Sequence, residues 1–475
     1  MKSSRVAVAA LITVSSVLVG WVLLPNIGRG QVEAGPVPPP PIPPNITHLT
    51  PVEKLGKLML YDHTLSDPPG YSCASCHIES TGFTGPSSEI NESDGPMPGV
   101  TGLFGPRKPY TYGYAAFSPE GPFFDSNVQM WIGGQNWDGR AVNLAAQAQG
   151  PPIAPISMNN TPAGTPPHQF SPLLAAKLAD RPYTPLFKRV YGKDVFELST
   201  PQQIYELFSE GVAAYESSPE VSQFSSKFDA ALAGNYTMTP SELNGMNLYF
   251  GQAQCFRCHS SANFPALQRT TQGRNVFTMY NFANIGIPKN PNNPFYQETG
   301  LNPLGLNFVD FGLGSNANGA LDGTKFFNTT PGDIPQFAGL FQTATCRNVD
   351  RRPSPDFVKA YMHNGVLKSL KDVVHFYNTR NLTTQPGEVI DFTQPNPYAN
   401  LVGTPLWPTP EVPSPVTLTN PTGAPPLAPG VAPPPGTNRF GQIGNLGLTD
   451  QQEDDVVAFL ATLSDGFTKP NPLSP

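Results

Sequence analysis

The chain has 475 residues, which is enough for two or three domains of ordinary size. Its 57 prolines and 44 glycines, with only 13% charged residues, indicate a loop-rich protein with few long surface helices. The net charge of −7 argues against nucleic-acid binding, which needs a basic surface.

The N-terminus has the pattern of an export signal. Lys2 and Arg5 precede an apolar stretch from Val6 to Leu24, and a basic start followed by an apolar segment is typical of secretion. The stretch is also close to the length that spans a bilayer, so residues 1–30 are either a cleaved signal peptide or an N-terminal membrane anchor. The Pro-rich residues 31–47 predict a stiff linker. Both alternatives predict a periplasmic location for the rest of the chain.

The next feature is a Cys-x-x-Cys-His motif at Cys73–His77, which recurs at Cys255–His259. This motif is the signature of c-type haem attachment, because two thiols at this spacing can form thioethers with one porphyrin while the adjacent histidine ligates the iron. A zinc site would place its two Cys pairs roughly 15–20 residues apart, and a disulfide or redox pair needs no histidine. The sequence therefore predicts two covalent haem c groups. They would be held by Cys73, Cys76, Cys255 and Cys258, with His77 and His259 as iron ligands.

Helix signals follow along the chain. Thr N-caps with Gln or Glu three residues later predict helices that begin after Thr200, Thr239 and Thr449. No segment has strong strand periodicity, so we expect a mainly α fold of two cytochrome c-type haem domains packed together. Pro-, Thr- and Asn-rich residues predict an irregular insertion in the second domain at about 383–436. The predicted domains are 48–235, an N-terminal haem domain, and 236–470, a C-terminal haem domain.

Several further segments carry a family resemblance. They are Leu55-Gly56-Lys57-Leu58, Trp137-Asp138-Gly139-Arg140, Gln147 with Gly150-Pro151, Asn284-Ile285-Gly286, Asp310-Phe311-Gly312-Leu313-Gly314, Arg347-Asn348-Val349 and Tyr361-Met362-His363-Asn364-Gly365. Together with the two haem motifs, they resemble the bacterial di-haem cytochrome c peroxidase family, including its MauG-like branch. The resemblance implies that hydrogen peroxide binds at the haem on His77, that the haem on His259 relays electrons, and that Trp137 carries them between the two.

The resemblance also implies partners and alternatives. The electron donor would be a small cytochrome c, a copper protein or the side chains of a protein substrate. Trp137 could instead be a packing aromatic, and Asp138 and Arg140 could be a structural ion pair. His363 resembles a histidine near the family's haem interface. Cys346 is left over from the haem motifs, and we expect a small buried apolar residue rather than a reactive thiol.

The resemblance also bears on the sixth ligand of each iron. No histidine follows the first motif until His168, whereas family members that need reductive activation carry one soon after it. The first iron is therefore expected to have an open face. Tyr377 stands at the family's sixth-ligand position for the second iron and shares a helical face with Leu370 and Val374. We expect Tyr377 to ligate the second iron, with Met362 as the alternative; a buried core tyrosine is the remaining interpretation.

The sequence departs from the family at two positions. Ser157 stands where the family has a glutamate near the peroxide-binding iron, and a serine hydroxyl is a poor base for the required proton transfer. Gln147 can donate a hydrogen bond there but cannot act as a base. Gly113 stands where an asparagine would hold calcium between the domains, so a calcium ion there is possible but unsupported. An oxygenase that activates dioxygen and a non-catalytic di-haem electron carrier therefore remain alternatives to the peroxidase or MauG-like oxidase.

Overall fold

A computed structural model describes residues 48–126, 128, 130–161, 172–261, 273–317, 337–391, 398–412 and 443–468. The predicted signal or anchor at 1–30 and the predicted linker at 31–47 lie outside the described residues. Residues 392–397 and 413–442 of the predicted insertion lie outside them as well. Within the described ranges, no helix has the length and apolar character that crossing a bilayer requires.

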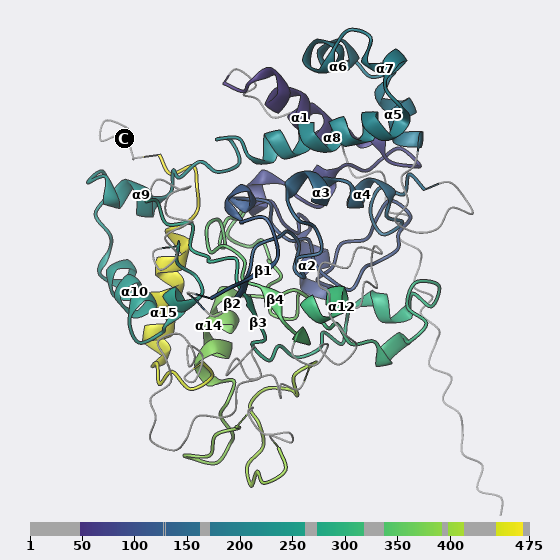
Figure 1. Ribbon diagram of the computed structural model, residues 1–475. Coiled ribbons are helices and arrows are strands. Elements are labelled where there is room, and N and C mark those ends of the chain that lie inside the picture. The colour runs from purple at the N-terminus through teal and green to yellow at the C-terminus, as the bar shows by residue number, and fades with distance from the viewer. Residues whose placement is uncertain are drawn as a thin grey trace, which may run out of the picture. The chain divides into compact units, whose positions relative to one another are not determined.

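Among the regular elements of the described chain helices predominate and strands are few (Figure 1), which confirms the predicted mainly helical class. The α-helices are α1 Pro51–Tyr61, α2 Ser88–Ser93, α3 Leu144–Ala148, α4 Gly150–Ile153, α5 Pro172–Leu178, α6 Thr184–Tyr191, α7 Val195–Leu198, α8 Pro201–Glu216, α9 Lys227–Leu232, α10 Pro240–Phe250, α12 Leu313–Ala317, α14 Leu370–Thr379 and α15 Asp450–Ala461. The strands form two antiparallel pairs, β1 Phe123–Asp125 with β2 Met130–Ile132, and β3 Phe282–Ala283 with β4 Phe341–Gln342.

Three of these helices begin where the N-cap signals place them. Thr200, Thr239 and Thr449 each accept a hydrogen bond from the backbone N–H three residues later, and each forms a reciprocal capping box. Such a cap satisfies backbone donors that the first helical turn leaves free. Helix α10 ends at Phe250, with Gly251 as its C-cap, shortly before Cys255.

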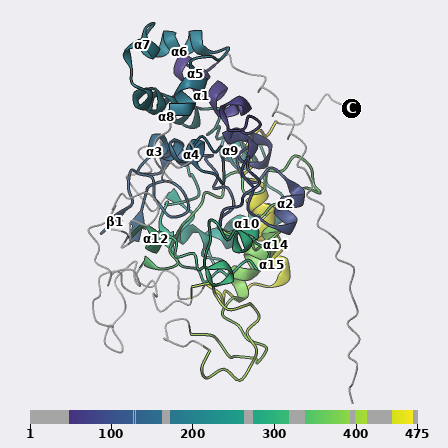
Figure 2. The same ribbon diagram turned by 90° about the vertical axis from the view of Figure 1, so that its right-hand side faces the viewer.

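Helix α1 lies against α8 and helix α10 lies against α15 (Figure 2). In each pair the backbones approach most closely at a glycine. A Cβ atom at Gly56 of α1 would lie 1.8 Å from the carbonyl oxygen of Gly211 in α8. In the second pair, a Cβ atom at Gly245 of α10 would lie 1.8 Å from the carbonyl oxygen of Asp455 in α15. Only glycine allows backbones to approach this closely. In each pair, the first helix leads into one Cys-x-x-Cys-His motif.

Each helix pair builds a hydrophobic core. The first core contains Leu55 and Met59 of α1 together with Phe208 and Val212 of α8, and its last buried residue is Val221. The second core extends from Phe228 to Leu463. We refer to residues 48–226 as the N-terminal half and to residues 227–468 as the C-terminal half; the predicted domain boundaries stay a prediction.

Polar contacts tie the two halves together. The ammonium group of Lys359, in the C-terminal half, donates to the carbonyl oxygen of Thr81 in the N-terminal half at 2.8 Å. It also donates to the carbonyl oxygens of Arg351 at 3.0 Å and Asn348 at 3.3 Å. Lys359 is buried, so three oxygen acceptors compensate for the water that its ammonium group lacks.

Candidate functional site

The first haem motif folds as a tight turn. Cys73–Ser75 forms a 3₁₀-helix, and the backbone N–H of His77 donates to the carbonyl oxygen of Cys73 at 3.1 Å. Cys73 and Cys76 are free thiols. Nδ1 of His77 lies 3.0 Å from the carbonyl oxygen of Phe83, so Nδ1 carries the proton and Nε2 is the nitrogen left for a metal. Burial lowers the pKa of His77 to about 4, which keeps the imidazole neutral.

The second motif repeats this local geometry. Cys255–Arg257 forms a 3₁₀-helix, and the backbone N–H of His259 donates to the carbonyl oxygen of Cys255 at 2.9 Å. Nδ1 of His259 lies 3.0 Å from the carbonyl oxygen of Ala344. Burial lowers the pKa of His259 to about 4 as well. Both motifs therefore present two thiols and a neutral imidazole whose Nδ1 is already engaged, which is the donor set that a c-type haem requires.

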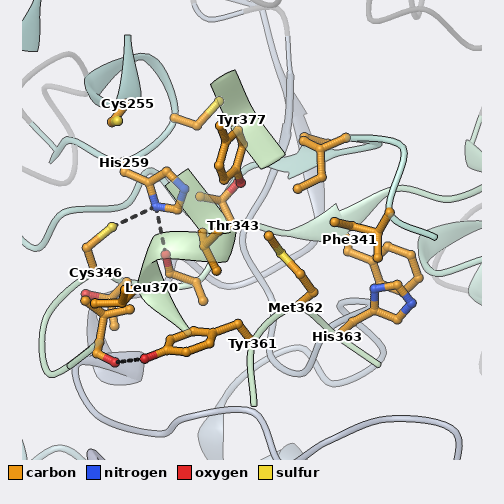
Figure 3. A pocket seen from close by; sticks show the side chains of 18 of the residues that line it. Cys255, His259, Phe341, Thr343, Cys346, Tyr361, Met362, His363, Leu370 and Tyr377 are labelled. Carbon is orange, nitrogen blue, oxygen red and sulfur yellow. Dashed lines mark hydrogen bonds between the residues drawn. The ribbon is translucent and has the colours of Figure 1, made fainter. Parts of the chain in front are cut away.

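A large cavity surrounds the second motif (Figure 3). Its empty volume is about 1770 Å³, part of which is open solvent. Cys255, Cys258 and His259 lie on its wall. The remaining wall is mostly apolar, with Leu370, Val373 and Val374 from α14 and Ile443, Leu446, Leu448, Val456 and Leu460 from the C-terminal segment. An apolar chamber with thiols and an imidazole at its wall fits a covalently bound porphyrin.

Both predicted candidates for the sixth ligand line this cavity. Tyr377 projects from α14 into the space beside His259, and Met362 lies on the same cavity wall (Figure 3). His375, two residues before Tyr377, is half-exposed on another face of α14. Burial raises the pKa of Tyr377, so a nearby cation is needed for the phenolate form. Ferric iron would supply that charge, as metals do for other ligands that bind after losing a proton.

Trp137 also lines the cavity and is held on two sides. Its indole N–H donates to the carbonyl oxygen of Lys108 at 2.9 Å, and the Tyr110 ring packs edge-on at a centroid distance of 4.7 Å. The ammonium group of Lys108 lies 5.7 Å from the centre of the Trp137 ring and donates to Oγ1 of Thr84 at 2.9 Å. Burial lowers the pKa of Lys108 to about 7. Thr84 follows the first haem motif, so this contact joins Trp137 to the chain beside that motif.

The neighbouring Asp138 belongs to a buried ion-pair network. Its carboxylate lies 2.6 Å from Arg107 and 3.1 Å from Arg140, and Arg107 also forms two hydrogen bonds of 2.7 Å with Asp310. Asp138 is fully buried. These contacts support the interpretation of Asp138 and Arg140 as a structural ion pair, which holds the backbone directly after Trp137.

Comparisons with known proteins give this geometry a context. A family model described as di-haem cytochrome c peroxidase matches residues 51–237. The methylamine utilization protein MauG of Paracoccus denitrificans is 30% identical over 424 residues, which cover 88% of this chain and 89% of that protein. The cytochrome-c peroxidase IdrP1 of Denitromonas iodatirespirans is 26% identical over 389 residues, 80% of this chain and 85% of that protein. The chain belongs to the di-haem cytochrome c peroxidase family.

Solved structures agree with this membership. The crystal structure of the diheme peroxidase BthA from Burkholderia thailandensis superposes with a TM-score of 0.62 at 26% identity, and the match covers 89% of this chain and 87% of that one. The protein is therefore a di-haem oxidoreductase with two c-type haems, which confirms the predicted cofactors and enzyme class. Both the peroxidase and the MauG-like interpretations fit this family.

Three further residues were singled out from the sequence. Gln147 and Ser157 do not line this cavity, whereas His363 does. Gln147 lies in α3, and Ser157 lies in the turn after α4, where its backbone N–H donates to the carbonyl oxygen of Ala154. His363 lines the cavity, stacks on Phe341 at a centroid distance of 3.6 Å, and has its Nε2 3.7 Å from a carboxylate oxygen of Glu411. Within the described ranges, no three or more His, Cys, Asp or Glu side chains form a metal-binding cluster.

Three cavity-lining residues were missed by the sequence reasoning. Lys108 and Lys359 are buried lysines, although neither position has a periodicity that predicts burial. Glu411 comes from the predicted irregular insertion, and it accepts a hydrogen bond of 3.1 Å from the backbone N–H of Asp310. Cys346 is buried, as the sequence predicts. Its position immediately before Arg347-Asn348-Val349 was the one sequence signal that it also lies at the haem site.

Proposed function

We propose that hydrogen peroxide is reduced to water at the iron bound by His77, with electrons delivered through the site around His259 and Tyr377. The observation that carries this proposal is the inequality of the two motifs. The cavity at His259 has two further ligand candidates on its wall, Tyr377 and Met362. In contrast, no histidine follows the first motif until His168. The iron at His259 would then have six ligands and transfer electrons, and the iron at His77 would keep one position open for peroxide.

The chain's own residues have defined tasks at the peroxide site. The haem supplies the redox-active iron, and the Phe83 carbonyl oxygen fixes the His77 tautomer so that Nε2 is the ligand. Reduction of peroxide also consumes two electrons and two protons. We assign Gln147 to hydrogen bonding with peroxide and Ser157 to relaying a proton, a task for which a carboxylate would be the better group.

Trp137 is proposed as the electron relay between the two sites. Its support is its position on the cavity wall and its fixed orientation, which the hydrogen bond to the Lys108 carbonyl oxygen and the Tyr110 contact maintain. Tyr377 is proposed as the sixth ligand of the second iron, and Met362 is the alternative. A phenolate oxygen stabilises oxidised iron, so Tyr377 would give the second site a low reduction potential.

The remaining assignments concern organisation and partners. We propose that residues 48–235 and 236–470 are the two haem domains, and that the repeated helix pairs α1–α8 and α10–α15 are their frameworks. Residues 1–30 would direct the chain to the periplasm, as a cleaved signal or an anchor. The electron donor would be a small cytochrome c, a copper protein or a protein substrate.

Electron paramagnetic resonance of the ferric protein tests the proposal. We expect one high-spin signal from the iron at His77 and one low-spin signal from the iron at His259, and a small excess of peroxide should remove the high-spin signal within seconds. Two low-spin signals would instead establish the electron carrier. A response to dioxygen with a reductant, but not to peroxide, would establish the oxygenase.

A further inference from the structure

Cys346 is the fifth cysteine and has no part in either haem motif. Its side chain is buried in the core of the C-terminal half, is not in a disulfide, and lines the cavity around His259. Its Sγ atom lies 3.3 Å from Nδ1 of His259 (Figure 3). A thiol that contacts an iron ligand is in a position to influence the iron itself.

The contact gives His259 two acceptors for one proton. Because Nε2 is the nitrogen that binds iron, Nδ1 carries the hydrogen and donates it. That hydrogen faces both the carbonyl oxygen of Ala344 at 3.0 Å and the sulfur of Cys346 at 3.3 Å. For His77, the described structure gives Nδ1 one partner, the carbonyl oxygen of Phe83. The two proximal histidines thus differ in one contact.

Tyr249 orients the thiol. Its hydroxyl donates to the carbonyl oxygen of His259 at 2.6 Å and lies 3.6 Å from the Cys346 sulfur. The Tyr249 hydroxyl is the donor toward both atoms, so it fixes the sulfur beside the imidazole. Sulfur has two lone pairs, and the second is left to face the imidazole.

We propose that Cys346 is a positioning residue for His259, whose sulfur accepts the Nδ1 hydrogen and thereby lowers the reduction potential of the second haem. An acceptor at Nδ1 draws the proton away from the ring and makes Nε2 a stronger electron donor to iron, which favours the ferric state. The inference rests on the proposed assignment of His259 as the iron ligand. It deepens that proposal by giving His259 a contact that His77 does not make within the described residues.

Spectroelectrochemical titration of the holoprotein tests this role, with the first haem as internal reference. Cys346→Ala removes the acceptor and should raise the potential of the second haem. Cys346→Ser restores a stronger acceptor and should bring the potential back to the wild-type value or below it. Tyr249→Phe keeps the sulfur but frees its orientation, and should cause a smaller rise. The first haem should keep its potential in all three variants.

A packing role would give a different pattern. If Ala and Ser shift the potential equally, or if neither shifts it, Cys346 is a packing residue and the proposal is wrong. Cys346→Val, which retains bulk without an acceptor, replaces Ala if the Ala variant does not fold with two haems. A His259→Ala variant keeps the two possible failures apart: an unchanged spectrum of the second haem would refute the ligand assignment itself.

Discussion

The two haem motifs have the same local fold and different surroundings. Each begins with a cysteine in a 3₁₀ turn and ends with a neutral histidine whose Nδ1 faces a backbone carbonyl oxygen. In the N-terminal half, Glu216 of α8 is a buried carboxyl that raises the pKa of the Cys73 thiol through its charge and has no hydrogen-bond partner at Oε2 in the described structure. Beside His259 lie Cys346 and a cavity that Tyr377 enters. The comparison indicates that the five-residue motif determines how each haem is attached, whereas residues far away in the sequence determine which groups surround each iron.

The largest expected effect comes from removing the proposed ligand of the second iron. Tyr377→Phe should convert its low-spin signal to high-spin and raise its potential, because an anionic oxygen that stabilises ferric iron is lost. Tyr361→Phe is the matched control, since Tyr361 lines the same cavity but its hydroxyl faces the carbonyl oxygen of Val349. Paramagnetic resonance measures both variants. An unchanged Tyr377→Phe spectrum would transfer the ligand role to Met362.

A second variant tests electron transfer between the two haems. Trp137→Phe should leave both haems in place and slow electron transfer between them by at least about tenfold, because phenylalanine is much harder to oxidise than tryptophan. Stopped-flow spectroscopy after peroxide addition measures the rate. Trp407→Phe is the control, because Trp407 packs on Phe376 on the other side of α14. Equal rates in the wild type and Trp137→Phe would make Trp137 a packing aromatic.

A third variant acts on the N-terminal site alone. Ser157→Glu supplies a carboxylate for proton transfer, and general acid–base catalysis typically contributes about 10²–10⁴-fold, so even partial success should speed peroxide consumption by about tenfold. Ser157→Ala should be slower than the wild type if the hydroxyl relays a proton. Peroxide consumption is followed at saturating electron donor. No gain from the carboxylate would mean that Ser157 does not lie beside the bound peroxide.

The last prediction concerns stability rather than electron transfer. Burial raises the pKa of Glu216 from 4.5 to about 8, so the folded protein keeps this proton at pH values where the unfolded chain has lost it. Stability should therefore fall as pH rises from about 4.5 to 8, by up to about 1.4 kcal/mol per pH unit, and level off above that range. Glu216→Gln should flatten this slope in denaturant titrations. An identical slope in the variant would show that another group is responsible.

Local signals predicted local structure well. The Thr caps placed the starts of α8, α10 and α15, because a cap depends on four consecutive residues. The Cys-x-x-Cys-His spacing likewise predicted two haems, which the family membership confirms. The cavity-facing side of α14 followed from helical periodicity, and Leu370, Val374 and Tyr377 all line the cavity.

The surroundings of each motif could not be predicted in the same way. The contact between Cys346 and His259 joins residues 87 positions apart, and nothing in either segment encodes the other. The Lys359 side chain donates to three backbone carbonyl oxygens, which we call its carbonyl cage, and to no carboxylate. No pairing of charges in the sequence therefore indicated that it is buried. Glu411 lies in a composition typical of an irregular loop, yet it contacts Asp310 and His363.

The carbonyl cage of Lys359 has a mechanical consequence. Its side-chain nitrogen is hydrogen-bonded to carbonyl oxygens of both halves, so separating the halves would leave a buried polar group without those acceptors. A hinge motion between the N-terminal and C-terminal halves is therefore unfavourable. Any rearrangement that accompanies a change of oxidation state is expected to stay within individual loops, and the spacing between the two irons should hold constant throughout turnover.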